Sequence, residues 1–161
     1  MSYMPASTTY TVERSTGVDA EPARLFAEVE DFHRWPAWSP WEDVDPDMTR
    51  TYSGADKGVG AVYTWSGNRK AGEGRMEITR TDEPTRVLVD LQFLKPFKSS
   101  SVTTFTFAPA GDGTRVTWTM AGPRTLAIRL MGVFTRMDKL VGTDFEKGLQ
   151  RLKTLAETPA A

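Results

Sequence analysis

Residues 101–120 read SVTTFTFAPAGDGTRVTWTM, and this stretch decides the fold class. Large apolar side chains alternate with threonine on both sides of the turn sequence Gly111-Asp-Gly113. A period of two residues is typical of a β-strand with one buried face, and a glycine-rich turn between two such strands predicts an antiparallel hairpin. The stretch therefore predicts two neighbouring strands whose aromatic face lies against a core and whose threonine face contacts water.

The same alternation extends upstream through most of the chain. Between Val44 and Pro123 it is interrupted by short turn signals such as Ser66-Gly-Asn68, and it predicts about six strands. An earlier alternating segment from Thr8 to Val18 predicts one more strand at the start. The sequence thus indicates an antiparallel meander with one apolar face.

Helical patterns stand on both sides of this meander. Asp19-Ala-Glu-Pro22 indicates a helix start with a capping acid and a proline in the first turn, and this helix is expected to end near Asp31. From Thr125 to Glu157 apolar residues recur at steps of three and four, which predicts a long amphipathic helix with a bend or a separate first segment. Its apolar stripe must cover the sheet, so residues 1–161 are expected to form one domain with a core at about 8–157.

Three of the five tryptophans lie within residues 31–43, which read DFHRWPAWSPWED. The prolines in this segment forbid a long regular helix and favour a turn of helix followed by a loop. Each indole can bury about 150–250 Å² and has an N–H that needs a hydrogen-bond partner. The segment is therefore expected to close over an apolar interior as a lid or plug.

Composition excludes several classes of function. The chain has 161 residues, a net charge of −1 and no cysteine. A balanced charge does not favour binding to nucleic acid, and the lack of cysteine excludes disulfides and cysteine-based zinc sites. No segment approaches the roughly 18 apolar residues that span a bilayer, and the N-terminus does not resemble a signal peptide. We therefore expect a cytoplasmic protein with no membrane span and no metal.

The predicted architecture suggests where a ligand would bind. A strongly curved sheet contacts one long helix well only along its centre, which leaves space at the open end for a small molecule. The candidate ligand-binding side chains are the inward aromatic and methionine residues and the tryptophan loop: Trp38, Trp41, Tyr52, Tyr63, Trp65, Met76, Phe93, Phe105, Phe107, Trp118, Met120, Phe134 and Met137. For each of them taken singly, a place in a packed core is the more common role, whereas the tryptophan loop over the open end favours a ligand-sized cavity for the set.

Few residues have chemistry suited to catalysis, and no catalytic residue is assigned. Tyr63 could orient a carbonyl oxygen and His33, the single histidine, could exchange a proton, so these two are weak candidates. A surface or capping role is the more common one for a histidine at this place. Asp31, Glu42 and Asp43 flank the tryptophans and favour caps or loop hydrogen bonds over acid/base work.

Glycines and charges within the expected elements have structural interpretations. Gly74 lies inside a strand pattern and predicts a bulge or a sharp bend of the sheet. Gly142 and Gly148 in the last helix allow a close approach to the sheet or leave space for a ligand. The alternation turns Glu73, Arg75 and Glu77 outward, where they are expected to form a solvated ladder.

Several short segments resemble one known superfamily when they are taken in order. They are Pro22-Ala-Arg-Leu-Phe26, Trp38-Ser-Pro-Trp41, Gly60-Ala-Val-Tyr-Thr-Trp-Ser-Gly-Asn68, Gly72-Glu-Gly-Arg-Met76 and Asp144-Phe-Glu-Lys-Gly-Leu149. The set resembles the SRPBCC superfamily, in its polyketide cyclase/dehydrase-like branch related to START and Bet v 1 domains. The resemblance covers about Tyr10 to Glu157. It implies an α+β helix-grip fold, in which a curved seven-stranded antiparallel sheet surrounds a long C-terminal helix and a hydrophobic cavity, with two short helices between strands 1 and 2.

Three classes of function fit these observations. The first is binding of a small hydrophobic or aromatic ligand in an internal cavity, without a cofactor and with the tryptophan loop as gate. The second, implied by the resemblance, is a polyketide cyclase or dehydratase with Tyr63 and His33 as polar groups. The third is a chaperone-associated or toxin-type module that binds a protein. The lack of an inward carboxylate and histidine pair favours the first over the second, and the lack of an outward apolar run weakens the third. The superfamily also includes lipid binders, and a monomer and a homodimer both remain open.

Overall fold

The computed structural model describes residues 9–43, 45, 47–68, 72–95, 98–123 and 133–158, without the side chains at positions 9, 43, 133–138 and 140. The chain begins with β1 (Thr9–Val18), α1 (Pro22–Val29) and the 3-10 helices η2 (Phe32–Ala37) and η3 (Pro40–Asp43). The strands β2 (Thr49–Gly54), β3 (Ala61–Ser66), β4 (Glu73–Asp82), β5 (Arg86–Lys95), β6 (Ser99–Ala110) and β7 (Gly113–Pro123) follow, and α3 (Val133–Glu157) comes last.

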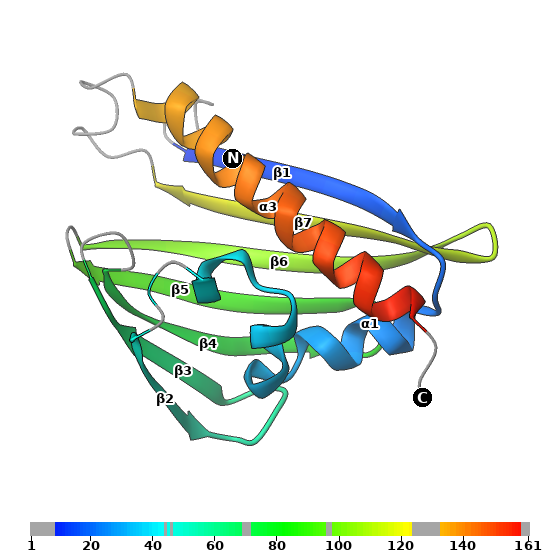
Figure 1. Ribbon diagram of the computed structural model, residues 1–161, viewed down its shortest axis with the longest axis horizontal. Helices are drawn as coiled ribbons and strands as arrows, with labels where there is room; N and C mark the ends of the chain where they lie inside the picture. The colour runs from blue at the N-terminus through cyan, green and yellow to red at the C-terminus, as the bar shows by residue number, and fades with distance from the viewer. Residues whose placement is uncertain are drawn as a thin grey trace, which may run out of the picture.

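The seven strands form one antiparallel sheet in the order β1-β7-β6-β5-β4-β3-β2. Figure 1 shows the curved sheet with α3 running along β1 and β7, and with α1 and the two 3-10 helices on the same side. The prediction of a helix-grip fold is confirmed. Its short helices between β1 and β2 are α1 and the tryptophan segment, which forms two 3-10 helices in place of one turn and a loop.

The register arranges the inward side chains in rows across the sheet, because directly paired residues of an antiparallel sheet share a face. One row passes from Val87 through Phe105 and Trp118 to Arg14. β6 begins at Ser99 and β7 ends at Pro123, and we call this end the open end of the sheet. A second row lies closer to the open end, four residues away from the first row along β6. It passes from Tyr52 through Tyr63, Met76 and Leu91 to Ser101.

The start of α1 corrects one expectation. Glu21 is the N-cap residue and Pro22 stands at the first helical position, but the Glu21 side chain makes no capping hydrogen bond. The predicted capping acid is therefore wrong, because a glutamate carboxylate extends one carbon too far for the short reach that favours aspartate and serine at this position. The helix buries Leu25, Phe26 and Val29 against the sheet.

A buried carboxylate fixes α1 to its neighbours. The side chain of Glu28 is 5% exposed and accepts hydrogen bonds from Arg24 at 2.5 Å and from Arg34 of η2 at 2.9 Å. Arg24 also donates to the backbone oxygen of Leu155 in α3 at 3.4 Å. Since a buried carboxylate needs ionic partners, this cluster sets the position of α1 relative to η2 and α3.

The long helix α3 runs without interruption from Val133 to Glu157, and residues 124–132 of the helix expected from Thr125 lie outside the described residues. Its two central glycines meet close neighbours. A Cβ atom on Gly142 would lie 2.5 Å from Cζ of Arg14, and a Cβ atom on Gly148 would lie 2.8 Å from Cζ3 of Trp118. The expected close approach of helix and sheet is confirmed at both positions.

The predicted irregularity at Gly74 is also present. The register between β4 and β5 shifts between Glu73 and Gly74, and the ring of Trp65 on β3 covers the glycine. On the outer face Arg75 pairs with Glu77 at 2.8 Å, and Lys95 lies 3.7 Å from Glu73. The outward, solvated position of the three residues is confirmed, but the Arg75–Glu77 pair runs along β4 and only the Glu73–Lys95 pair crosses between strands. Within the described residues, no helix is both long enough and apolar enough to cross a membrane.

Candidate functional site

The tryptophan segment packs into the interior between α1, the sheet and α3. Trp35 is 3% exposed and Trp38 is not exposed. Their indole nitrogens donate to the backbone oxygens of Val29 at 2.9 Å and of Glu28 at 3.2 Å. The polar ends of both rings are thus bonded to the carboxyl end of α1, as expected for rings that close over an apolar interior.

The middle of the sheet carries a cluster of packed rings. Trp118 stacks on Phe145 of α3 with ring centroids 4.1 Å apart, and Trp38 meets Trp118 edge-on at 5.6 Å. Trp41 of η3 also meets Trp118 edge-on, at 5.5 Å, and its indole donates to Asp144 at 3.2 Å. Phe105 is fully buried in the same cluster. The protein's own side chains therefore pack against these candidate ligand-binding rings.

The open end of the sheet carries a second group of inward side chains. Tyr63, Met76 and Leu91 are 5–9% exposed, and Trp65 and Phe93 are partly buried. The rings of Trp65 and Phe93 meet edge-on at 5.5 Å, and Tyr63 lies 6.0 Å from Trp65. We call these five residues the open-end wall. They lie on β3, β4 and β5, away from the main contacts of α3, which are with β1.

The other candidate ligand-binding residues are distributed between these two regions. Phe107 is fully buried beside Phe26 of α1, at 6.2 Å, and Met120 is 6% exposed next to Thr103. Tyr52 stands beside Tyr63 on the edge strand β2, with ring centroids 5.3 Å apart. The side chains of Phe134 and Met137 lie outside the described residues. Ligand contact remains a prediction for every residue of the set.

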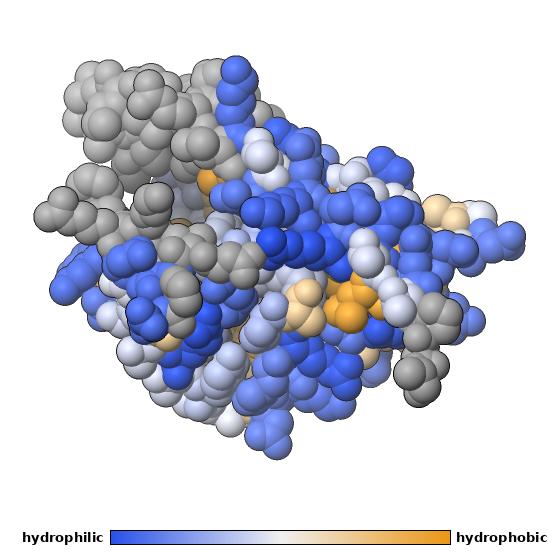
Figure 2. Space-filling model, viewed as in Figure 1, coloured by the Kyte–Doolittle hydropathy of each residue, from blue (hydrophilic) through white to orange (hydrophobic). Residues whose placement is uncertain are grey.

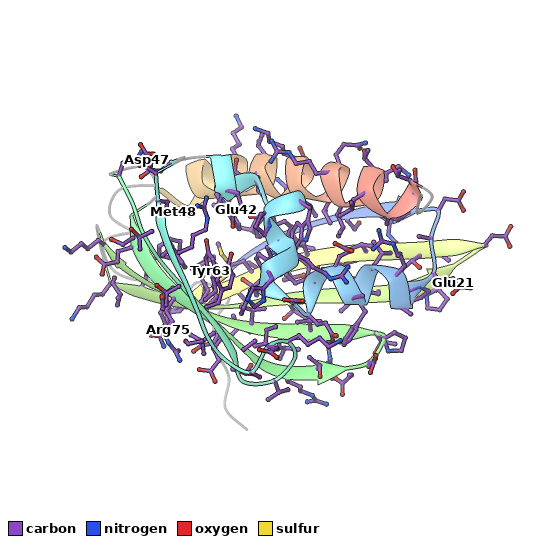
Figure 3. The ribbon with its side chains drawn as sticks, turned by 60° about the horizontal axis from the view of Figure 1, so that its bottom comes forward. Glu21, Glu42, Asp47, Met48, Tyr63 and Arg75 are labelled. Atoms are coloured by element: carbon purple, nitrogen blue, oxygen red, sulfur yellow. The ribbon has the colours of Figure 1, made fainter. Side chains whose placement is uncertain are left out.

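A polar cluster borders the open-end wall. It consists of Glu42 from η3, Arg50 from β2 and Tyr63 from β3, and Figure 3 shows Tyr63 between the sheet and Glu42. The Glu42 carboxylate accepts hydrogen bonds from Arg50 Nε at 2.5 Å and from the Tyr63 hydroxyl at 3.3 Å. Arg50 also donates to the backbone oxygens of Glu42 and Met48. The cluster fastens η3 to the edge of the sheet and holds Tyr63 in one orientation.

The environment of Tyr63 determines what its hydroxyl can do. Burial raises the pKa of Tyr63 far above its usual value, and the negative charge of Glu42 raises it further, while Arg50 opposes the shift. The phenol therefore remains protonated throughout the neutral pH range. It can donate a hydrogen bond to a ligand oxygen, but it is not suited to act as a base.

His33 lies outside this cluster, in a small pocket at the edge of the sheet. The Asp31 carboxylate accepts from the backbone N–H of His33 at 3.0 Å and contacts Nδ1 of its ring at 2.9 Å. The imidazole stacks on Tyr52 with centroids 4.3 Å apart, and its side chain is 53% exposed. The structure thus confirms a surface position for His33 and a capping role for Asp31, and it brings the two into a pair.

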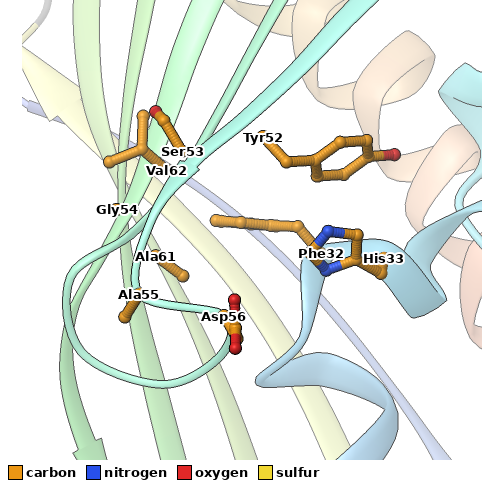
Figure 4. A pocket seen from close by; sticks show the side chains of 9 residues that line it. All are labelled: Phe32, His33, Tyr52, Ser53, Gly54, Ala55, Asp56, Ala61 and Val62. Carbon is orange, nitrogen blue, oxygen red and sulfur yellow. The ribbon is translucent and has the colours of Figure 1, made fainter.

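The pocket beside His33 has a volume of about 80 Å³ (Figure 4). It is lined by Phe32, His33, Tyr52, Ser53, Gly54, Ala55, Asp56, Ala61 and Val62. Sites for drug-sized molecules usually have volumes of about 300–1,000 Å³, so this pocket suits only a small group or water. Within the described residues, no cluster of three or more histidine, cysteine or acidic side chains is suited to hold a metal ion.

Several polar groups of the interior were not predicted from the sequence. Arg50, Tyr10, Ser101 and Thr103 received no functional interpretation, yet the last three are 5–7% exposed. Burial raises the pKa of Tyr10, and a hydrogen bond with Ser101 opposes the shift. The alternation that turns Phe105 inward also turns Ser101 and Thr103 inward, so their burial could have been predicted.

The outer surface offers little apolar area. The large hydrophobic side chains that are exposed in the described residues are Val59, Leu94 and Val102. Figure 2 shows a mainly hydrophilic face with a small hydrophobic area near the meeting of α1 and α3. A broad apolar surface for a protein partner is therefore not evident on this face.

Comparisons with known proteins agree with the fold. The model of the polyketide cyclase/dehydrase and lipid transport family matches residues 9–157, and the chain belongs to this family and to the SRPBCC superfamily. A search of curated proteins finds no match.

Solved structures with the same fold are distant in sequence. The chain is similar to the di-domain ARO/CYC protein StfQ from the steffimycin biosynthetic pathway, with a TM-score of 0.72 and 10% identity over 94% of this chain and 51% of that chain. It is similar to Ara h 8.0201, with a TM-score of 0.65 and 14% identity over 92% and 97% of the two chains. It is also similar to the Aha1 dimer from Colwellia psychrerythraea, with a TM-score of 0.65 and 15% identity over 94% and 98%. Identities this low demonstrate the fold alone.

Proposed function

We propose that this member of the polyketide cyclase/dehydrase and lipid transport family binds a small hydrophobic or aromatic molecule, without a cofactor, at the open end of the sheet. The observation that carries the proposal is the open-end wall, where the rings of Trp65 and Phe93 are only partly buried and lie away from the main contacts of α3. Apolar surface of this kind, with a few polar groups at its margin, is typical of small-molecule sites.

The polar cluster supplies the orienting group. Tyr63 remains protonated and is fixed by Glu42, so it can donate a hydrogen bond to an oxygen of the bound molecule. The 3-10 helix η3 carries both Glu42 and Trp41, and we propose it as the gate of the site. A cytoplasmic location and binding of lipid-like molecules belong to the same proposal.

A substitution that fills the site tests this proposal. Leu91 is 6% exposed and lies on the inner face of β5, whereas Leu94 of the same strand is 45% exposed. The uncharged probe N-phenyl-1-naphthylamine fluoresces when it enters an apolar site. Leu91→Trp should abolish probe binding while the protein remains folded, because the larger side chain occupies the ligand's space. Leu94→Trp is the matched control and should bind the probe as the unmodified protein does.

Two results would contradict the proposal. If the interior at Leu91 is already filled, the tryptophan would overpack it and lower the free energy of unfolding by about 1–3 kcal/mol. A loss of this size in urea unfolding, or probe binding that survives in Leu91→Trp, would show that the open end is packed core.

A cyclase or dehydratase is the second candidate. The specific observation in its favour is the hydrogen bond from Tyr63 to Glu42, which places a neutral donor and a carboxylate together beside an apolar wall. In such a reaction the phenol would stabilise a developing enolate oxygen. Tyr63→Phe should then abolish turnover of a polyketide-like substrate and leave the fold intact, and unchanged turnover would exclude this role.

A further inference from the structure

The indole N–H of Trp118 is buried and has no hydrogen-bond partner among the residues that the structure describes. Trp118 is 1% exposed. The indoles of Trp35, Trp38 and Trp41, by contrast, each donate to a protein oxygen. An unsatisfied buried donor costs about 1–3 kcal/mol, so such groups are uncommon unless something absent from the protein itself completes them.

The packing of the ring indicates which of its sides is available. Cζ3 faces α3, where a Cβ atom on Gly148 would lie 2.8 Å from it, and one face of the ring stacks on Phe145. In an indole, Nε1 and Cζ3 lie on opposite sides of the fused rings. The N–H therefore points away from the contact with Gly148.

A second inward polar group lies diagonally across the strands. Phe105 pairs with Trp118, and Thr103 is the next inward residue of β6 towards the open end. Thr103 is 5% exposed, so its hydroxyl is held in the interior beside the ring cluster. Diagonal neighbours on one face of a sheet are about 7–8 Å apart, so one bound molecule can reach both groups.

We propose that the Trp118 N–H and the Thr103 hydroxyl form an inner polar subsite that receives a neutral oxygen acceptor of the bound molecule. This inference rests on the proposed function, since it places the inner end of the same ligand. A ketone, ester or quinone oxygen fits the subsite. A carboxylate does not fit the subsite, because a buried charge needs an ionic partner. Arg14 lies in the same row as Trp118, but it is already paired with Glu146 at 3.1 Å.

The register also gives the length of the ligand. Ser101, in the row that contains Leu91, and Phe105, in the row that contains Trp118, are four residues apart on β6. At about 3.4 Å per residue this separation is roughly 14 Å. A molecule that contacts both the open-end wall and Trp118 therefore has the length of two or three fused rings, with its acceptor oxygen at the inner end.

Two probes that differ only in the acceptor test the subsite. They are 2-acetylnaphthalene and 2-ethylnaphthalene, with affinities measured by displacement of N-phenyl-1-naphthylamine. The unmodified protein should bind the ketone about tenfold more tightly, which is the usual effect of satisfying one buried hydrogen-bond donor. Replacing Trp118 with 3-benzothienylalanine, which has sulfur in place of N–H and keeps the ring shape, should remove this preference.

Thr103→Val is the second variant, and it keeps the site testable if the first does not fold. It should reduce the preference for the ketone and leave the affinity for 2-ethylnaphthalene unchanged. Equal affinity of the unmodified protein for both probes would overturn the subsite and leave the proposed function standing. Binding of neither probe would refute the proposed function itself. If the benzothienyl variant loses stability without ligand but keeps the preference, the N–H donates to a neighbouring ring face and the subsite is refuted.

Discussion

A methyl group added at each of the two central glycines of α3 should have opposite effects on stability. Gly142→Ala and Gly148→Ala introduce the same atoms into the same helix. A Cβ atom at position 148 would lie 2.8 Å from Cζ3 of Trp118 and 2.9 Å from Cδ of Pro40. A Cβ atom at position 142 would meet the guanidinium of Arg14, which is the far end of a flexible side chain that is 28% exposed. Each variant is therefore the control for the other.

The expected magnitudes follow from these neighbours. Alanine stabilises a helix interior by about 1 kcal/mol relative to glycine, and this gain applies at both positions. At Gly142 the guanidinium can move aside, and the partly exposed Arg14–Glu146 pair that it gives up contributes about 0–1 kcal/mol. At Gly148 the buried indole and the proline cannot move without disturbing the ring cluster, and overpacking costs about 1–3 kcal/mol. Gly148→Ala should thus be about 1.5 kcal/mol less stable than Gly142→Ala.

Urea unfolding followed by far-UV circular dichroism measures this difference. We expect the midpoint of Gly142→Ala at or above that of the unmodified protein and the midpoint of Gly148→Ala below it, with similar slopes. Near-UV circular dichroism of Gly148→Ala should also change, because the stacking of Trp118 on Phe145 is disturbed. Equal midpoints for the two variants would refute the view that α3 rests directly on Trp118 at Gly148.

Three further substitutions test the buried polar groups and the sheet bulge. Folding raises the pKa of Tyr63, so its contribution to stability is fully present below about pH 10 and is lost as the pH rises further. In urea unfolding above that pH, the free energy of unfolding of the unmodified protein should fall by up to about 1.4 kcal/mol more per pH unit than that of Tyr63→Phe. Parallel pH curves for the two proteins would contradict this. Glu28→Gln should lower the free energy of unfolding by about 1–3 kcal/mol. The loss is no larger because both arginine partners of Glu28 are partly exposed. An unchanged unfolding midpoint would show that this cluster is dispensable. Gly74→Ala should lower the melting temperature, because its Cβ atom would lie 2.5 Å from Cζ2 of Trp65 and 2.6 Å from the backbone oxygen of Gln92. An unchanged melting temperature would show that the bulge tolerates a side chain.

The period of the sequence was sufficient to predict the sheet. The segments from Thr103 to Phe107 and from Val116 to Met120 pair directly in the structure, with their rings on one face. This success has a physical cause, because shifting a strand by one residue would turn all its apolar side chains into water. The glycines were predictable for a similar reason. A glycine in the interior of a strand or helix usually lies against a neighbouring group that leaves no room for a side chain. Gly74 lies against the ring of Trp65 in this way, and Gly148 lies against that of Trp118.

The polar contacts were not predictable in the same way. Arg50 reaches Glu42, eight residues earlier, only because η3 folds back against the edge of the sheet, and no local pattern determines that turn. Glu28 has helical spacing typical of a solvated face, but the docking of η2 over it buries its carboxylate. Such positions depend on how elements pack together, whereas periodicity reports only which face of a single element is apolar.

The tryptophan segment has two halves that are held in different ways, and this difference bears on how a ligand would enter. In η2, Trp35 is 3% exposed and its indole donates to the end of α1, so displacing it would expose a large ring and break a buried hydrogen bond. In η3, Trp41 is only partly buried. This half is held by two side-chain hydrogen bonds near the surface, in which Trp41 donates to Asp144 of α3 and Arg50 donates to Glu42. Exchanging such contacts for water costs little compared with exposing a buried indole. Opening at η3 alone would uncover the edge of Trp118 and the polar cluster at Tyr63 while the rings of η2 keep the core intact. Under the proposed function, plug and gate are therefore separate parts of one segment, and the ring between them is Trp118, which both Trp38 and Trp41 contact.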